Sequence, residues 1–228
     1  KHHKGDYMDK VIVISIDAMI SDDIKEFEKL SNASKLLSGK KAIAEKIHCI
    51  YPTYTYPCHT TIMTGCYPDK HGIYHNDVFN PYSDKDEWFW YSSAIKMPTM
   101  IDAARRAGLT TASISWPVMG SSPADYLIAE IWADKETDDP SPVFDKADSP
   151  SVKHIFEKNK HLLNWMKTPG LDLFASSSAS DIIREFRPDL TFVHFSYLDH
   201  QRHNNGAETA KNINAIKFID ERLGEIIK

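Results

Sequence analysis

Short apolar runs alternate with amphipathic segments along most of the chain. Residues 11–16 (VIVISI) and 190–197 (LTFVHFSY) are nearly continuous apolar runs of strand length. Such runs are typical of strands that are buried on both faces of a parallel sheet. Residues 42–50, 109–115 and 127–132 are predicted as further strands, because they are bounded by turn residues and rich in β-branched or aromatic side chains.

Between these runs, apolar residues recur at helical intervals. Ser21 is expected to open a helix, with Asp22 and Asp23 in its first turn. Its apolar face would carry Ile24, Phe27, Leu30, Leu36 and Leu37. Further helices are predicted over residues 98–108, 151–167, 172–186 and 208–228. This alternation predicts an α/β domain with a mostly parallel sheet and helices on both faces.

Composition narrows the class of protein without identifying it. The 228 residues are enough for one large domain, and 42% of them are hydrophobic, as in ordinary globular proteins. Acidic residues outnumber basic ones by 32 to 27, so the net charge of −5 argues against nucleic-acid binding. Oligomeric state stays open.

The sequence contains few signals of cellular targeting or of the redox state of its cysteines. No apolar run is long enough to span a membrane, and about ten residues before the first strand leave no room for a signal peptide. A cytoplasmic location is therefore expected. Three clustered cysteines, an odd number, argue against a secreted disulfide framework, so Cys49, Cys58 and Cys66 are expected as reduced thiols.

The densest chemistry lies in residues 51–76, YPTYTYPCHTTIMTGCYPDKHGIYHN. Pro52 and Pro57 exclude the interior of a helix, so Thr55 is expected in an exposed turn. A short helix from Cys58 to Gly65 would then direct its free N–H groups towards Thr55. That arrangement favours a bound anion such as phosphate.

A threonine hydroxyl is a weak nucleophile until a base or a metal ion draws off its proton. Asp17 follows the first predicted strand, and Asp199 and His203 follow residues 190–197. Because ligands of open α/β sheets bind beyond the carboxyl ends of the strands, these side chains are expected to converge on Thr55. The plainer alternatives are that Asp17 only caps a turn and that Asp199 with His203 is a solvated pair.

Four ordered motifs resemble the type I phosphodiesterase/nucleotide pyrophosphatase family of the alkaline phosphatase superfamily. Any one of them would be a weak signal, whereas their shared order and spacing are specific. The motifs are Ile16-Asp17-Ala18, the segment from Pro52 to His59, the segment from Thr64 to Ile73 followed by Asn76, and the segment from Asp199 through His203 to Gly206.

The resemblance implies an alkaline-phosphatase-like three-layer sandwich and assigns roles to six positions. Thr55 would be the nucleophile that forms a covalent phosphothreonine intermediate. Asp17 would share one metal ion with Thr55, and Asp199 and His203 would bind a second. Asn76 would hold a phosphate oxygen. The sixth position is Tyr56, whose ring would stack on the leaving group or base.

The same resemblance implies two divalent metal ions. Mixed carboxylate and imidazole ligands make zinc the expected ion, with manganese left open. The family completes its sites with a later D-H-G strand and a distant histidine, which residues 1–228 do not contain. The sequence is therefore expected to be a single catalytic domain that is incomplete at its C-terminus and inactive by itself.

The expected activity is hydrolysis of phosphodiesters or nucleotide pyrophosphates, with a small-molecule substrate. A phosphonate or phosphomonoester hydrolase of the same superfamily is the nearest alternative. An alternative of another class is a non-catalytic binding domain that has lost its metals. Residues 134–150 are predicted as a lid or cap insertion. The aromatic segment 77–93 is read as a loop pinned by buried rings in preference to a wall that faces the substrate.

Overall fold

Four of the predicted apolar runs pair into one parallel sheet. The computed structural model describes residues 9–38, 45–82, 87–132, 139–166 and 168–228. The sheet has the strand order β1-β6-β4-β5, and each pairing is parallel. The strands are β1 (Val11–Ile16), β4 (Thr111–Ile114), β5 (Tyr126–Ile128) and β6 (Leu190–Phe195).

Alternation along the strands gives the sheet two different faces. In register, Ser15 lies opposite His194 and Ile16 lies opposite Phe195. Side chains of successive strand residues point to opposite faces, so Ser15 and His194 share one face with Phe192. Val193 and Phe195 lie on the other face, where they join the main core cluster.

The described residues contain the following helical segments. The α-helices are α1 (Ile24–Phe27), α2 (Ala33–Leu37), α3 (Thr55–Thr64), α4 (Pro68–His71), α5 (Met100–Arg106), α6 (Ser141–Ala147), α7 (Lys153–Asn159), α8 (Gly170–Phe186), α9 (Tyr197–Asn205) and α10 (Ile213–Ile226). The 3₁₀ segments are η1 (Ser21–Asp23), η2 (Ser92–Ala94), η3 (Pro150–Val152), η4 (Lys160–Met166) and η5 (Thr209–Asn212). Within this part of the chain, none of the helices has both the length and the apolar character that crossing a bilayer requires.

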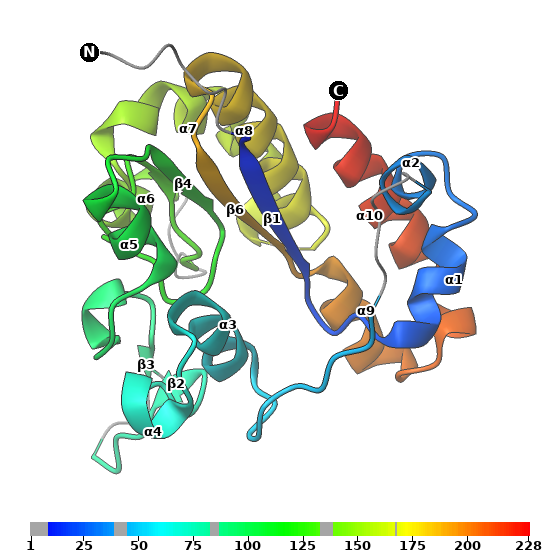
Figure 1. Ribbon diagram of the computed structural model, residues 1–228, viewed down its shortest axis with the longest axis horizontal. Coiled ribbons are helices and arrows are strands. Elements are labelled where there is room, and N and C mark those ends of the chain that lie inside the picture. Colours follow the sequence, from blue (N-terminus) through cyan, green and yellow to red (C-terminus); the bar gives the residue numbers. More distant parts are fainter. Residues whose placement is uncertain (1–8, 39–44, 83–86, 133–138, 167) are drawn as a thin grey trace, which may run out of the picture.

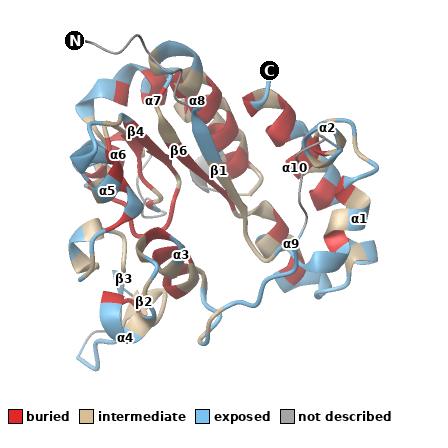
Figure 2. Cartoon of the chain, in the orientation of Figure 1, coloured by how far each residue is buried: buried red, intermediate tan, exposed pale blue. Residues whose placement is uncertain are grey.

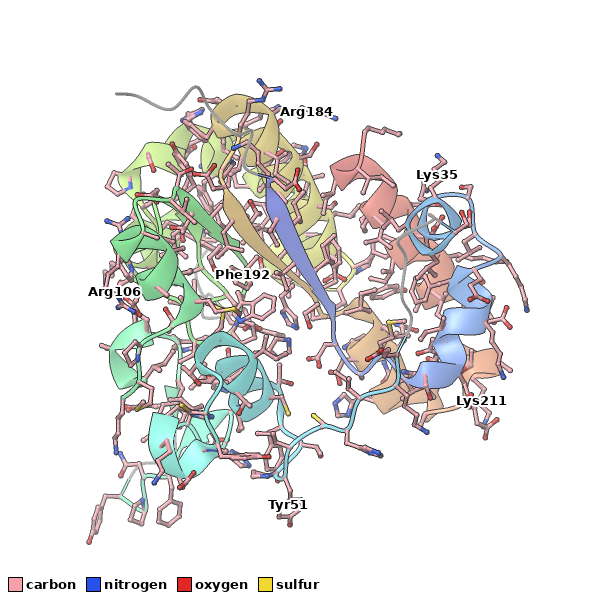
Figure 3. All side chains as sticks on the ribbon, viewed as in Figure 1. Lys35, Tyr51, Arg106, Arg184, Phe192 and Lys211 are labelled. Atoms are coloured by element: carbon pink, nitrogen blue, oxygen red, sulfur yellow. The ribbon has the colours of Figure 1, made fainter. Side chains whose placement is uncertain are left out.

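Helices cover both faces of the sheet (Figure 1). Met63 of α3 and Ile101 of α5 pack with Phe192, which points from β6 towards these helices (Figure 3). On the opposite face, α7, α8 and α10 supply Phe156, Phe174 and Ile219 to the main core cluster. The expected three-layer arrangement is confirmed, and the buried residues concentrate where the sheet meets these helices (Figure 2).

Two sequence predictions near the N-terminus are wrong. The helix expected from Ser21 to Leu37 is broken into η1, α1 and α2, because the backbone N–H groups of Asn32 and Ala33 donate to the Asp220 carboxylate of α10 at 3.2 and 2.6 Å. Of the strand expected over residues 42–50, residues 42–44 lie outside the described part, and residues 45–50 form no strand. The backbone of residues 45–50 runs from beside α9 towards α3 and lies at the surface (Figure 1).

Residues 134–150 were predicted as a lid. Residues 134–138 lie outside the described part of the chain. The rest contains α6, whose Phe144 and Ala147 are 2% and 0% exposed and belong to the main core. Helix α6 is therefore anchored by apolar burial, and a lid or cap insertion over residues 134–150 stays a prediction.

The aromatic segment after Asn76 is pinned by packing. It contains a two-stranded antiparallel ladder of β2 (Asp77–Val78) and β3 (Glu87–Trp88). Trp88 and Trp90 stack with ring centroids 5.3 Å apart, and both contact the ring of Tyr56 edge-on. The interpretation as a loop held by buried rings therefore fits the described residues.

Candidate active site

The four predicted metal ligands lie around one pocket at the carboxyl end of the sheet. Asp17 follows β1, Thr55 begins α3, and Asp199 and His203 lie on α9. All four line an open pocket of about 640 Å³. The tertiary structure therefore brings together segments that are 38 to about 180 positions apart, as expected for the end of a parallel sheet.

The closest contact in this group joins Thr55 and Asp17. The Thr55 hydroxyl donates to Asp17 Oδ2 at 3.1 Å. Thr55 does not lie in an exposed turn before the helix, as predicted, but is the half-buried first residue of α3. The reason is that Pro57 is tolerated within the first turn of a helix, where the N–H that proline lacks has no intrahelical partner.

The expected row of free N–H groups at this helix start is incomplete. Tyr56 donates its backbone N–H to Asn76 Oδ1 at 2.9 Å, and Pro57 has no N–H. Asn76 therefore anchors the helix through its carbonyl oxygen. Among the described residues, its side-chain NH₂ group donates no hydrogen bond and so has both hydrogens available.

Tyr56 does not have the position that stacking on a substrate requires. Its side chain is 0% exposed and packs among Ile73, Val118, Trp88 and Trp90. The aromatic residue at the pocket is instead Tyr54, which is 45% exposed and contacts His75 with ring centroids 4.1 Å apart. Successive residues at a helix start point in different directions, so the one-position offset from Thr55 turns Tyr56 inwards.

Asp199 and His203 form the second pair of the pocket. They lie four positions apart on α9, which places them on one helix face, and His203 Nε2 is 3.4 Å from Asp199 Oδ2. His203 is mostly exposed. Burial and the nearby negative charge of Asp17 raise the pKa of Asp199. The repulsion that Asp199 receives from Asp17 is of the kind that a bound cation would relieve.

Sequence reasoning gave no role to three polar residues behind this pocket. His59 lies one helical turn after Thr55, and its Nδ1 is 2.7 Å from the Thr55 carbonyl oxygen. Its Nε2 is 2.8 Å from Ser15 Oγ. The ring of His194 packs edge-on against the ring of His59, with ring centroids 4.6 Å apart. Its Nε2 lies 3.6 Å from Asp17 Oδ2. Two sequence patterns could have identified these residues. His59 lies four positions after Thr55, at helical spacing, and strand alternation applies to Ser15 and His194.

These neighbours determine the charge of Asp17. Burial acts to raise the pKa of Asp17, but the positive charge of His194 at 3.6 Å, with smaller contributions from His59 and Thr55, lowers it to about 2. Burial acts to lower the pKa of His194, but Asp17 and the carboxylates of Glu130 and Asp172 raise it to about 9. Asp17 is therefore a stable anion and a weak base.

A buried arginine connects the two halves of the pocket. Arg202 lies on α9 between Asp199 and His203, and it donates to the carbonyl oxygen of Ala18, next to Asp17. Its guanidinium also pairs with Asp23 at 2.8 Å, and the two side chains are 7% and 0% exposed. This ion pair holds α9 against the turn that follows β1.

The donors fit a divalent metal ion in type. Carboxylates, an imidazole and a hydroxyl are the ligands that zinc or manganese takes in proteins. Across the described parts of the chain, no three histidine, cysteine, aspartate or glutamate side chains converge as ligands of one ion. Asp17 with Thr55 and Asp199 with His203 are two pairs of side chains with metal-compatible donors.

The chain matches a known protein family. The family model described as "Type I phosphodiesterase / nucleotide pyrophosphatase" matches residues 11–228. The chain is 24% identical over 232 residues to ectonucleotide pyrophosphatase/phosphodiesterase family member 3 of Bos taurus, covering 96% of this chain and 22% of that protein. It is 25% identical over 231 residues to bis(5'-adenosyl)-triphosphatase ENPP4 of Bos taurus, and this match covers 96% of this chain and 42% of that protein.

Solved structures show the same fold. Phosphonoacetate hydrolase from Sinorhizobium meliloti superposes with a TM-score of 0.63 at 18% identity, covering 96% of this chain and 53% of that one. Murine ectonucleotide pyrophosphatase/phosphodiesterase 5 superposes with a TM-score of 0.58 at 17% identity, and the match covers 96% of this chain and 51% of that one.

The chain spans less than half the length of these curated relatives and about half the length of the solved structures. The family match nevertheless includes every segment that lines the pocket, from β1 to α9. The chain belongs to the type I phosphodiesterase/nucleotide pyrophosphatase family.

Proposed function

We propose that this chain carries the nucleophile of a metal-dependent hydrolase that cleaves phosphodiesters or nucleotide pyrophosphates. The observation that carries the proposal is the 3.1 Å hydrogen bond between the Thr55 hydroxyl and Asp17 inside the pocket. In this proposal Thr55 attacks phosphorus and becomes a phosphothreonine ester, which water then hydrolyses.

The residues of the chain have separate tasks. Asp17 holds the Thr55 hydroxyl in place, but a carboxylate with a pKa of about 2 accepts its proton poorly. Two bound divalent ions, held by Asp17 and Thr55 and by Asp199 and His203, would supply the missing activation and neutralise the leaving oxygen. His59 fixes the backbone of Thr55, and the Asn76 NH₂ group donates to a phosphate oxygen.

A nucleotide substrate is supported by the relatives. The bovine relative named bis(5'-adenosyl)-triphosphatase ENPP4 and an inactive variant of murine ectonucleotide pyrophosphatase/phosphodiesterase 5, solved in complex with AMP, both point to adenine nucleotides. In this chain the exposed ring of Tyr54 is the aromatic surface that the pocket offers to a base or leaving group.

A phosphonate hydrolase is the second candidate. The similar solved structure of the Sinorhizobium meliloti enzyme contains phosphonoacetate. The two activities share the nucleophile and differ in the leaving group, so the fold cannot separate them.

Turnover measurements on the full-length protein test both candidates, because residues 1–228 are expected to be inactive by themselves. With zinc or manganese present, p-nitrophenyl thymidine phosphate should be cleaved faster than p-nitrophenyl phosphate or phosphonoacetate. Thr55→Ala should reduce turnover more than ~1000-fold. Thr53→Ala is the matched control, because Thr53 is an exposed threonine of the same pocket, and it should stay near wild type.

A quenched reaction tests the covalent step directly. Intact mass and peptide mapping should find a phosphoryl or nucleotidyl adduct on Thr55 in the wild type and none in Thr55→Ala. Faster turnover of phosphonoacetate would favour the second candidate. Tight nucleotide binding without metal binding or turnover would favour a non-catalytic binding domain.

A further inference from the structure

Two thiols meet at the rim of the pocket. Cys49 Sγ and Cys58 Sγ are 3.0 Å apart, and neither is in a disulfide. Cys49 is exposed and Cys58 is half-buried, so one of the two is directly accessible to a reagent in solution. The third cysteine, Cys66, lies beyond the end of α3 and is an internal reference.

The two thiols join different parts of the pocket wall. Cys49 belongs to residues 45–50, which have no regular secondary structure and reach the pocket at Ile47 and Cys49. Cys58 lies on α3, three residues after Thr55. A covalent bond between them would close a ring that contains Thr53, Tyr54 and Thr55.

We propose that Cys49 and Cys58 form a thiol modification site, which low-molecular-weight disulfides oxidise to an intramolecular disulfide that ties this pocket wall to α3. The site is independent of the proposed hydrolase activity, because it rests on the sulfur contact alone.

The reaction balances as an ordinary thiol–disulfide exchange. The Cys49 thiolate attacks one sulfur of oxidised glutathione, breaks its S–S bond and releases one glutathione thiolate, which takes up a proton. Cys58 then loses its proton, attacks the Cys49 sulfur and releases the second glutathione. In total, two protein thiols lose two electrons and two protons, and one oxidised glutathione becomes two reduced molecules.

The sulfur contact decides which product accumulates. Because Cys58 already touches Cys49, its effective concentration at the mixed disulfide far exceeds that of free glutathione. The intramolecular disulfide should therefore replace the adduct. It closes a short loop and restricts the unfolded chain, so the oxidised protein should melt about 5 °C higher than the reduced one.

Redox titration with glutathione tests the site. The Cys66→Ser protein is equilibrated in mixtures of oxidised and reduced glutathione, the free thiols are alkylated, and the intact mass is measured. We expect loss of two alkylation sites with no glutathione adduct, and peptide mapping that joins Cys49 to Cys58. The Cys58→Ser variant should instead keep one stable glutathione adduct on Cys49. The Cys49→Ser variant is its matched counterpart, because it removes the other thiol of the pair.

Three outcomes would overturn the proposal. They are a stable glutathione adduct when both thiols are present, a dimer linked through Cys49, and a melting temperature that is equal in the oxidised and reduced states. Wild-type peptide mapping, with Cys66 alkylated, gives the same readout without any substitution. Neither readout uses turnover, so the test is separate from that of the hydrolase.

Discussion

The Thr55 hydroxyl donates a hydrogen bond to Asp17 Oδ2 at 3.1 Å, although the two residues are 38 positions apart. Asp17 follows the half-exposed outer strand β1, and Thr55 lies at the start of a helix on one face of the sheet. The pair gives the pocket a hydroxyl and a charged acceptor in fixed relation. A substitution can remove the negative charge of Asp17 while it keeps the hydrogen bond between Asp17 and Thr55.

Asp17→Asn removes the charge of this pair and keeps an oxygen that accepts the Thr55 hydrogen bond. We expect affinity for a divalent ion, measured by calorimetric titration of zinc, to fall more than ~100-fold, because even indirect ligand supports are worth 10–100-fold. Asp22→Asn, an exposed aspartate in the adjoining turn, should leave metal binding unchanged. Equal zinc affinity in wild type and Asp17→Asn would contradict the proposed metal role.

Asn76→Asp tests the free end of the asparagine side chain. The variant keeps an acceptor for the Tyr56 N–H, so α3 should stay anchored, but it replaces the NH₂ donor by a second acceptor with negative charge. We expect kcat on p-nitrophenyl thymidine phosphate to drop by about 100–1000-fold with the melting temperature nearly unchanged. Asn80→Asp is the control, because Asn80 also accepts a backbone N–H but is exposed. A loss of equal size in both variants would refute the proposed donor.

The buried pair of Arg202 and Asp23 should contribute to stability. Arg202→Met leaves the carboxylate of Asp23 buried without its countercharge, which typically costs ~3–5 kcal/mol of unfolding free energy. Adding Asp23→Asn should recover part of this loss. Arg105→Met breaks a half-exposed pair with Asp125 and should cost less than ~1 kcal/mol. Urea denaturation of the wild type, Arg202→Met, Asp23→Asn and the double variant gives the coupling energy, and additive effects would argue against the ion pair.

Asp148 should make stability depend on pH. Burial raises its pKa to about 8, although Oδ1 accepts the Ala129 N–H at 2.8 Å. The unfolded carboxyl group loses its proton near pH 4 while the folded one keeps it to about pH 8. The Asp148 contribution therefore falls as pH rises through this window, by at most ~1.4 kcal/mol per pH unit, and is constant above it.

Asp148→Asn keeps the acceptor for Ala129 and cannot titrate. The wild type should lose stability relative to this variant between pH 4 and 8, as measured by urea denaturation at several pH values. Asp22→Asn, which removes an exposed carboxylate elsewhere, should follow the wild-type profile. A constant difference between wild type and Asp148→Asn across this range would contradict the raised pKa.

Much of the fold could be predicted from local patterns. The run VIVISI is β1 as expected, and residues 172–186 lie within α8, because strong apolar periodicity survives tertiary packing. Predictions were wrong where long-range contacts decide. The turn at Asn32 depends on Asp220, which is 188 positions away, and no local signal in residues 21–37 reports that contact.

The candidate site was likewise predictable only in part. By itself the sequence determined the types of side chain available, the order of the motifs and the strand ends that carry Asp17 and Asp199, because these follow from residue identity and local periodicity. Only the tertiary structure decided that Tyr56 turns into the core, that His194 lies behind Asp17, and that Cys49 meets Cys58. The physical reason is that direction and contact depend on the packing of segments far apart in the chain, which local sequence does not encode.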